Sequence, residues 1–297
     1  MKCDLCPRKC LVDRKKGEKG ICGQTENLKV ARAALHFWEE PCISGDAGSG
    51  AVFFSGCSLH CVFCQNENIA NGTVGKEISL ERLVDIFLEL QEKRANNINL
   101  VTPGHFVPQI VKALDQARKE GLTLPVVYNT SSYETVDTIK MLEGYVDIYL
   151  PDFKYMSPVL SKKYSHAPDY AEVAKAAIAE MVRQTGKAVF VNGEEDNLIL
   201  SGTIVRHLTL PGCMADSMQI LKYLHDTYGD KIYISIMNQF TPLSNLEKYP
   251  ELNRRITDVE YETLVDYAID IGIENGFIQE GDTAEESFIP AFDCEGV

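Results

Sequence analysis

The chain has 297 residues, of which 45% are hydrophobic and 24% charged, and its formal net charge at pH 7 is −14. This composition is that of a globular protein, and the length suffices for one large domain with a small appendage. No apolar run approaches the roughly 18 residues of a membrane span, and the first residues, MKCDLCPRKC, lack the apolar stretch of a secretory signal. We therefore expect a cytoplasmic protein without a membrane partner.

Charge is distributed unevenly along the chain. The first 30 residues carry eight Lys and Arg against four Asp and Glu, a net +4 that leaves −18 for the remainder. The acidic body argues against a nucleic-acid partner, whereas the basic head is either solvated surface or a docking site. Ten cysteines in a reducing compartment favour metal ligation or redox chemistry over disulfides.

Residues 1–45 are interpreted as a cysteine-rich head and a bridging segment. The head contains the pattern C-x2-C-x3-C-x11-C, formed by Cys3, Cys6, Cys10 and Cys22. Four thiolates with a short C-x2-C pair close a tetrahedral zinc site or hold an iron–sulfur cluster, and we weigh the two metals equally. Because so short a segment lacks an apolar period, the metal would supply its folding energy. The alternative is four free thiols on a flexible head.

The remaining cysteines and two aromatic residues of the bridging segment carry weaker signals. Cys42 and Cys213 are interpreted as small buried hydrophobes, and Cys294 as incidental. His36 and Trp38 are interpreted as a packing plug.

Residues 46–297 alternate strand and helix patterns. Strands are predicted over 51–56, 97–104, 125–131, 146–154, 187–192, 203–212 and 231–240, with a polar EEDN turn between the fifth and sixth. Helices are predicted over 79–94, 106–120, 133–143, 169–186, 215–229 and 258–272, with Ser79 as the N-cap of the first. This alternation predicts an α/β fold, a full or partial β/α barrel of about six units.

Polar motifs follow six of the predicted strands. They are the cysteine loop at 57–64 and the motifs TPGH, NTSS, PDFK, RHL and MNQF. Chemistry in a β/α barrel occurs at the carboxyl ends of its strands, so we expect these motifs to converge on one site.

The loop CSLHCVFC places Cys57, Cys61 and Cys64 directly behind the strand AVFFSG. Three cysteines leave one iron of a [4Fe–4S] cluster without a thiolate, which allows a substrate or cofactor to bind there. Alternative fourth ligands that would close the site are His60, Asn66 and Cys213.

This loop, on an α/β barrel pattern, resembles the radical S-adenosylmethionine (SAM) superfamily over about residues 46–280. Within it, the chain is most similar to the pyruvate formate-lyase activating enzymes, in a branch with the head CxLCPRxC…GxxGxCG followed by ALHFWEEPCISG. The resemblance implies a [4Fe–4S] cluster, reductive cleavage of SAM and a 5′-deoxyadenosyl radical that removes a hydrogen atom. In the activating enzymes the hydrogen comes from a backbone glycine of a glycyl-radical enzyme, and a flavodoxin or ferredoxin donates the electron.

The resemblance also implies which residues contact SAM in the first half of the barrel. Phe63 matches the aromatic residue near the adenine. Gly104 and His105, with Thr102 nearby, match a Gly-Gly-Glu stretch that contacts the SAM amine. Asn129 and Ser131 match an Asp-Thr-Asn-Gly stretch, without its aspartate.

Further SAM contacts are implied in the second half. Asp152 and Lys154 keep an Asp-x-Lys motif that pairs with the SAM carboxylate. Arg206 matches an arginine for the carboxylate or ribose. Asn238 and Gln239 replace a histidine at the last strand end.

We therefore expect a radical SAM enzyme that is activase-like toward a glycyl-radical enzyme. A radical SAM enzyme acting on a small molecule or a peptide is the alternative. A non-catalytic iron–sulfur or zinc scaffold is disfavoured by the three intact cysteines and the Asp-x-Lys motif.

Overall fold

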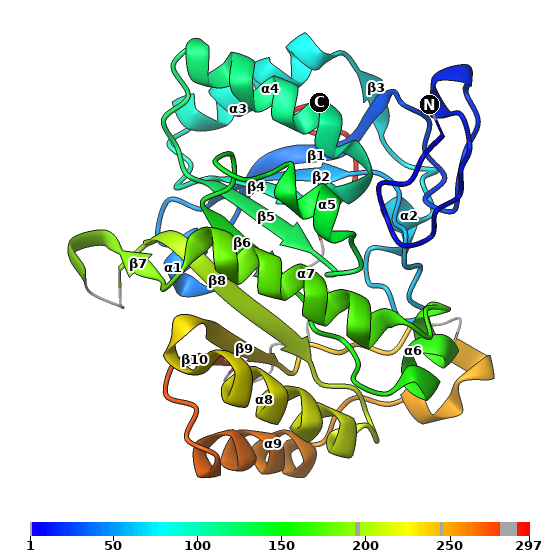
Figure 1. Ribbon diagram of the computed structural model, residues 1–297, viewed down its shortest axis with the longest axis vertical. Coiled ribbons are helices and arrows are strands. Elements are labelled where there is room, and N and C mark those ends of the chain that lie inside the picture. Colours follow the sequence, from blue (N-terminus) through cyan, green and yellow to red (C-terminus); the bar gives the residue numbers. More distant parts are fainter. Residues whose placement is uncertain (1, 194–196, 244–245, 280–289) are drawn as a thin grey trace.

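A computed structural model describes residues 2–193, 197–243, 246–279 and 290–297 (Figure 1). The strands are β1 Leu28–His36, β2 Ser49–Phe54, β3 Lys76–Ile78, β4 Ile98–Val101, β5 Val126–Thr130, β6 Ile148–Pro151, β7 Val189–Phe190, β8 Ile199–Leu208, β9 Tyr233–Met237 and β10 Gly276–Ile278. The α-helices are α1 Pro41–Ser44, α2 Glu67–Ala70, α3 Leu80–Glu92, α4 Val107–Lys119, α5 Val136–Lys140, α6 Pro158–Ser165, α7 Tyr170–Thr185, α8 Met214–Tyr228 and α9 Asp258–Asp270.

The strands form one curved sheet in the order β10-β9-β8-β6-β5-β4-β2-β1-β3, with β7 attached to β8. The neighbours β2, β4, β5, β6, β8, β9 and β10 are parallel, whereas β1 runs antiparallel to β2 and to β3, and β7 runs antiparallel to β8. Among the described strands the sheet does not close on itself. The α/β prediction is confirmed, and of the two forms left open by the sequence the structure is the partial barrel.

Most predicted elements occur within a few residues of their expected bounds. The Ser79 hydroxyl accepts a hydrogen bond from the Arg82 backbone, as expected of an N-cap. Strand β1 was not predicted, because it pairs on both sides and its residues do not alternate between polar and apolar. The bridging part of residues 1–45 is therefore built into the sheet. Most of the EEDN turn, residues 194–196, lies outside the described residues.

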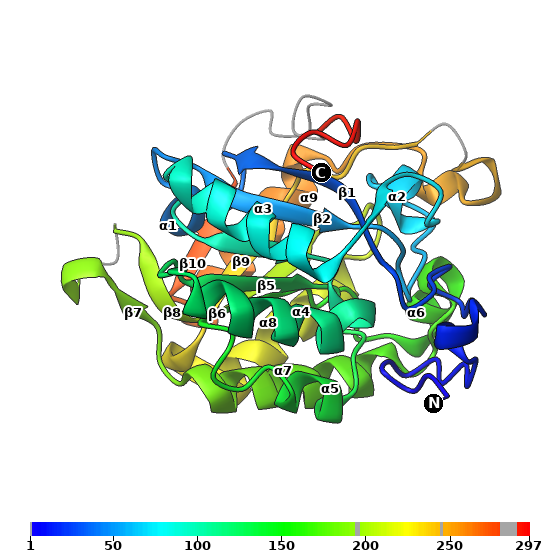
Figure 2. The same cartoon turned by 90° about the horizontal axis from the view of Figure 1, so that it is seen from above.

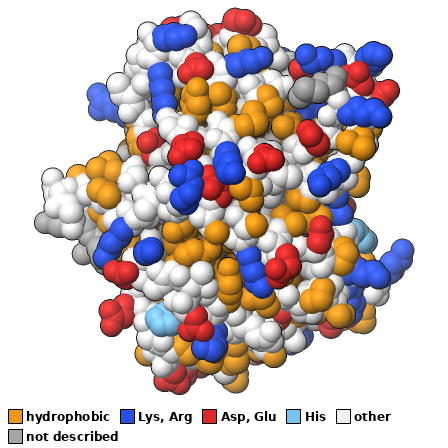
Figure 3. All heavy atoms as spheres, viewed as in Figure 1, with side chains coloured by type: hydrophobic (Ala, Val, Ile, Leu, Met, Phe, Trp, Pro, Cys, Tyr) orange, Lys and Arg blue, Asp and Glu red, His pale blue; other side chains and the backbone are white. Residues whose placement is uncertain are grey.

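Helices cover the outer face of the sheet in two groups (Figures 1 and 2). Helices α3 and α4 bury apolar residues against the first strands, and α7, α8 and α9 do so against the last ones. None of the described helices is long and apolar enough to cross a lipid bilayer. On the face seen in Figure 3, Lys and Arg lie interspersed with Asp and Glu and form no continuous basic surface.

Inside the curve of the sheet, the alternation of side chains separates a core from a site. Successive residues of a strand point to opposite faces, so every second residue points inward. Near the strands' amino ends the inward residues are apolar, among them Val127, Ile148 and Ile204. The short helix α1 inserts Cys42 and Ile43 into this cluster and fills the lower end of the barrel. Nearer the carboxyl ends the same rows continue as polar side chains.

The plug is thus Cys42 and Ile43, not the pair His36 and Trp38. Cys42 is 3% exposed, which agrees with its interpretation as a small hydrophobe. Trp38 is 58% exposed, so its interpretation as a packing residue was wrong.

One residue near the end of β8, His207, points away from the pocket and fixes the strand against helix α8. His207 is buried; its Nδ1–H donates to the Phe153 carbonyl at 2.8 Å, and the Ser217 hydroxyl lies 2.8 Å from Nε2. Burial lowers the pKa of His207 to about 4, although the hydrogen bond to Phe153 opposes the shift. The imidazole is therefore neutral in the folded protein at neutral pH.

This buried histidine predicts a dependence of stability on acid. The unfolded chain takes up a proton below a pKa of about 6.5 and the folded one only near 4, so folding stability falls as pH decreases through that window. Between pH 7 and pH 5 the free energy of unfolding of the wild-type apoprotein should fall by about 2 kcal/mol through this group. The free energy of unfolding of His207→Asn should fall correspondingly less. Urea unfolding at both pH values measures the difference. An unchanged pH dependence in the variant would contradict the expectation.

Candidate active site

A pocket of about 340 Å³ lies at the carboxyl ends of the parallel strands. All six expected strand-end segments contribute to it, so the predicted convergence of these loops is found. Of the expected site residues, it is lined by Cys57, Cys61, Cys64, Phe63, Thr102, Asn129, Ser131, Asp152, Lys154, Arg206 and Gln239. Gly104, His105 and Asn238 do not line it.

The three cysteines face one end of this pocket. The Ser165 hydroxyl lies 3.0 Å from the Cys61 Sγ, and the Leu59 amide donates to the Cys57 Sγ at 3.4 Å. Burial raises the pKa of the Cys64 thiol to about 12 and also raises that of Cys61, although Lys154 opposes the shift at Cys61. Buried thiolates with hydrogen-bonded sulfurs need a positive partner, which is what iron supplies.

The donor set therefore fits an iron–sulfur cluster better than a single ion. Within the described ranges, no three His, Cys, Asp or Glu side chains are placed to hold one metal ion. In a cluster, by contrast, each thiolate binds a different iron.

Two of the alternative fourth ligands lie elsewhere. The His60 Nε2 donates to the Ile21 carbonyl in the head at 2.8 Å, and Cys213 caps helix α8 outside the pocket. Asn66 does line the pocket.

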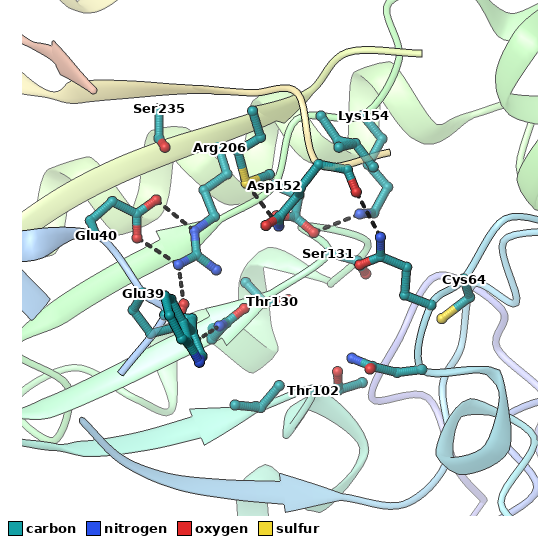
Figure 4. Close-up of a pocket in the computed structure, with 18 of the residues that line it drawn as sticks. Glu39, Glu40, Cys64, Thr102, Thr130, Ser131, Asp152, Lys154, Arg206 and Ser235 are labelled. Atoms are coloured by element: carbon teal, nitrogen blue, oxygen red, sulfur yellow. Dashed lines mark hydrogen bonds and ion pairs between the residues drawn. The ribbon is translucent and has the colours of Figure 1, made fainter. Parts of the chain in front are cut away.

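Beside the cysteines, Asp152 and Lys154 form an ion pair at 2.6 Å (Figure 4). Burial by itself would lower the pKa of Lys154, but Asp152 outweighs it and the pKa is raised. Lys154 is thus a fixed cation. Its backbone N–H donates to the Tyr170 hydroxyl at 2.9 Å, and this hydroxyl also lies 2.9 Å from the Ser131 carbonyl. Tyr170 therefore joins the ends of β5 and β6 below the pocket.

At the other end of the pocket, Arg206 is held by two glutamates (Figure 4). Its Nε and Nη2 donate to Glu40 at 2.8 and 2.5 Å, and Nη2 also contacts Glu39. Asn99 donates to Glu39 at 2.8 Å. Burial would raise the pKa of Glu40, but Arg206 outweighs it and the pKa is lowered, so this carboxylate is ionised.

Glu39 and Glu40 are site residues that the sequence reasoning missed. They belong to the bridging segment, and their signal was the doublet in HFWEEPC, two charges next to apolar residues. Arg206, expected to face the SAM carboxylate or ribose, has two protein carboxylates as neighbours instead.

Three expected SAM contacts lie outside the pocket. His105 is buried, its Nε2–H donates to the Ser55 carbonyl at 2.7 Å, and its own carbonyl accepts from Arg14 at 2.5 Å. Burial lowers the pKa of His105 to about 3, so its imidazole is neutral, and the residue lies outside the pocket in which SAM is expected. The backbone N–H of Asn238 donates to the side-chain Oε1 of Gln279.

Gly104 lies beside a buried carboxyl that the sequence did not reveal. A Cβ at Gly104 would come within 2.9 Å of the Glu134 carboxyl group, so glycine is required there. Glu134 accepts hydrogen bonds from Tyr128 and Thr130, and burial raises its pKa. A second cavity of about 20 Å³ is lined by Gly104, Glu134 and Cys57.

The fold and the site have counterparts among known proteins. Residues 51–198 match the family model described as the radical SAM superfamily. The uncharacterized protein MJ0674 of Methanocaldococcus jannaschii is 28% identical over 272 residues, which are 90% of this chain and 74% of that protein.

Two solved structures share the fold. SuiB of Streptococcus suis bound to S-adenosylmethionine has a TM-score of 0.52 at 13% identity, over 76% of this chain and 48% of SuiB. HydG, a maturase of the [FeFe]-hydrogenase, has a TM-score of 0.51 at 14% identity, over 78% of this chain and 52% of HydG. The chain thus spans about half the length of these two proteins, and at such identity the likeness shows the fold alone.

An open parallel sheet with a cysteine loop behind its first parallel strand defines the class of protein. The chain carries a radical SAM domain over residues 51–198, and this domain identifies the protein as an enzyme. This superfamily uses a [4Fe–4S] cluster and SAM.

The network around Arg206 predicts a large effect on stability. Arg206→Leu would leave Glu39 and Glu40 buried without a cation, which costs about 3–5 kcal/mol for a broken buried pair. The triple variant Glu39→Gln, Glu40→Gln, Arg206→Leu should recover most of that loss, because none of these three positions then carries a charge. Urea unfolding of the apoproteins compares the two. Equal stability of wild type and the single variant would show that these charges are not coupled.

Proposed function

We propose that this chain binds a [4Fe–4S] cluster through Cys57, Cys61 and Cys64, binds SAM in the adjoining pocket, and removes a hydrogen atom from a substrate. The observation that carries the proposal is the position of the three thiols at one end of a pocket whose walls come from all the parallel strand ends. When bound, the reduced cluster supplies the electron that splits SAM into methionine and a 5′-deoxyadenosyl radical.

The charges of the pocket support SAM as its ligand. Among the described lining residues, Glu39, Glu40 and Asp152 oppose Lys154 and Arg206, which gives a net charge of −1. SAM carries a sulfonium, an ammonium and a carboxylate, a net +1. Complementary charge favours binding in a site from which water is excluded.

Individual groups can then be given roles. Lys154, near Cys61, is the cation closest to the cluster end and orients the SAM carboxylate, while Asp152 holds Lys154 in place. Thr102, Asn129, Ser131 and Gln239 supply polar groups along the walls, and Phe63 supplies an apolar surface for the adenine. Because Glu39 and Glu40 occupy Arg206, its role is to keep this wall in shape rather than to neutralise the SAM carboxylate alone.

The rim of the pocket favours a polypeptide substrate. Trp38 lines the pocket and Phe37 a neighbouring hollow, and the two side chains are 58% and 50% exposed. Exposed aromatic side chains beside a site are typical of surfaces that bind an extended peptide segment. This supports an activase-like role in which the hydrogen comes from a glycine of a glycyl-radical enzyme. Action on a free peptide or a small molecule is the alternative function.

The proposal also covers the head, the cellular compartment and the electron donor of the enzyme. Cys3, Cys6, Cys10 and Cys22 all line one small cavity in the head, which supports a second metal there. We further propose a cytoplasmic enzyme, because the radical chemistry requires a reducing compartment and a one-electron donor such as a flavodoxin or ferredoxin.

The cysteine assignment predicts a spectroscopic loss. Changing Cys57, Cys61 or Cys64 to alanine removes one of three iron ligands, so each variant should lose the cluster absorbance and the reductant-dependent formation of 5′-deoxyadenosine. Cys213→Ala, outside the pocket, is the matched control and should keep both. Each measurement uses a background in which the four head cysteines are serine. Full activity in all three variants would end the radical SAM assignment of this loop.

The role of Lys154 predicts a loss of SAM affinity without loss of iron. A charge-assisted hydrogen bond at a buried site is worth about 1.5–3 kcal/mol, so Lys154→Met should bind SAM at least about tenfold more weakly. Asp152→Asn should change affinity in the same direction. Lys222→Met, which removes a surface ion pair with Asp226, is the control. Calorimetry of the cluster-loaded proteins gives the affinities, and normal SAM binding by the first two variants would contradict this role.

The substrate class is tested by isotope transfer. A glycyl-radical enzyme containing glycine deuterated at Cα should pass deuterium to 5′-deoxyadenosine and gain an organic radical signal in electron paramagnetic resonance (EPR) spectra. Product 5′-deoxyadenosine without deuterium would favour the small-molecule or peptide alternative.

A further inference from the structure

The four thiols of the head form a built site. Cys3, Cys6, Cys10 and Cys22 line a cavity of about 10 Å³. The Ile21 amide donates to the Cys10 Sγ at 3.3 Å. Amide hydrogen bonds to sulfur stabilise thiolates and tune the potential of an iron–sulfur cluster.

The glycine at position 20 shows how closely the head is packed around its sulfurs. A Cβ at Gly20 would come within 2.8 Å of the Cys10 Sγ. Gly20 has no left-handed backbone that would by itself require glycine. The approach of the sulfur is therefore what excludes a side chain there.

This site lies directly against the cysteine loop of the active site. Cys6 of the head and Cys57 of the loop line the same cavity of about 20 Å³, which has room for a single water molecule. The head, drawn in dark blue, lies beside α2 in Figure 1 and beside α6 in Figure 2, at the carboxyl ends of the strands.

Arg8 makes the first connection between the two cysteine loops. It lies between Cys6 and Cys10, and its guanidinium donates to the carbonyls of Ser58, Ser165 and His166 at 2.9, 3.0 and 2.6 Å. Ser58 follows Cys57, and the Ser165 hydroxyl lies 3.0 Å from the Cys61 sulfur. The same guanidinium lies over the Tyr133 ring at 5.0 Å, which fixes its orientation.

The active-site loop reaches back into the head. The His60 Nε2 donates at 2.8 Å to the carbonyl of Ile21, whose amide donates to Cys10. Gly56, next to Cys57, is so close to the head that a Cβ there would meet the Cys22 carbonyl at 2.5 Å. Each cysteine loop therefore contributes a side chain to the backbone of the other. Such a short hydrogen-bonded connection between the two cysteine loops favours electron transfer. A metal centre that only stabilised the head would not need this connection.

The outer surface of the head has the charge that an electron donor would need. Lys2, Lys9, Lys15, Lys16 and Lys19 are all exposed, and the first 30 residues carry +4 on a protein whose remainder carries −18. Opposite charge steers a diffusing protein to the correct surface and repels it from the rest of the molecule. An acidic one-electron carrier would therefore approach the head.

We propose that Cys3, Cys6, Cys10 and Cys22 hold an iron–sulfur cluster that relays electrons from an acidic carrier protein to the cluster at Cys57, Cys61 and Cys64. The carrier, a reduced flavodoxin or ferredoxin, is oxidised by one electron and the head cluster is reduced by one. The head cluster then returns to its oxidised state as the active-site cluster takes up that electron. This relay rests on the proposed function.

The first test asks which metal the head holds. Anaerobically reconstituted full-length protein should contain iron and sulfide for two clusters, and EPR of the reduced protein should count two one-electron centres. The variant Cys3→Ser, Cys6→Ser, Cys10→Ser, Cys22→Ser should keep one. Zinc in the wild-type head, or a single reducible centre in the wild type, would overturn the relay.

The second test separates the relay from the radical SAM reaction. Reduction of the active-site cluster is followed by its EPR signal, with either reduced flavodoxin or photoreduced deazaflavin as donor. The quadruple head variant should lose reduction by flavodoxin and keep reduction by the small molecule. If flavodoxin reduces the active-site cluster of the variant as fast as that of the wild type, the relay is overturned. Absence of SAM cleavage by the deazaflavin-reduced wild type would instead overturn the proposed function.

A third test leaves the head cysteines intact, in case their replacement unfolds the head. Lys15→Glu, Lys16→Glu, Lys19→Glu should slow flavodoxin-driven reduction about tenfold or more at low ionic strength, and added salt should diminish the difference. The matched control is Lys93→Glu, Lys119→Glu, Lys231→Glu, three exposed lysines just before β4, β5 and β9, at the opposite end of the strands. Equal rates in the two triple variants would overturn docking of the carrier at the head.

Discussion

The ion pairs between Arg206 and the two glutamates Glu39 and Glu40 hold the open barrel in its curved shape. A closed barrel joins its first and last strands by backbone hydrogen bonds, but the described strands of this sheet do not pair in that way. Arg206 comes from β8, whereas the glutamates come from the segment between β1 and β2, which lie five and four places away from β8 in the sheet. The contact therefore crosses the interior, and the pocket lies between this charged wall and the cysteine loop (Figure 4). Charges buried in this way are stable only as a complete set, which explains why Asn99 also contacts Glu39.

The regular parts of the molecule follow from local patterns, and those parts were predictable. A strand's alternation decides which side chains face inward, so motifs at the ends of parallel strands must meet. That reasoning predicts that Thr102, Asn129, Asp152 and Arg206 share one site, and all four line the pocket. The Ser79 cap was equally local, since a hydroxyl before an amphipathic segment needs only the next three residues to act.

The sequence could not predict which residues far apart in the chain contact one another. Arg206 and Glu40 are 166 positions apart, and nothing in either neighbourhood names the other. His105 was assigned to SAM because its position followed a matching strand, yet Ser55 and Arg14 bind it from two other segments. Glu134 gave no signal, because a single acidic residue in a loop is ordinarily solvated surface. In each case the physical reason is burial, which only the assembled fold determines.

The head changes how the active-site loop is supported. Three contacts join residues 56–60 to the head: Arg8 donates to the Ser58 carbonyl, His60 donates to the Ile21 carbonyl, and Gly56 lies against the Cys22 carbonyl. The head is thus part of the scaffold of the site, although none of its described residues lines the main pocket.

Gly20 shows how sensitive the proposed metal site of the head is to a single residue. One methyl group at that position would displace the Cys10 sulfur, while every residue that lines the main pocket stayed the same. If the head holds a metal as proposed, a lineage could lose it by a single substitution and retain all four cysteines in its sequence. In homologous genomes, the residue at this position would then be a better guide to a loaded head than the cysteine motif itself.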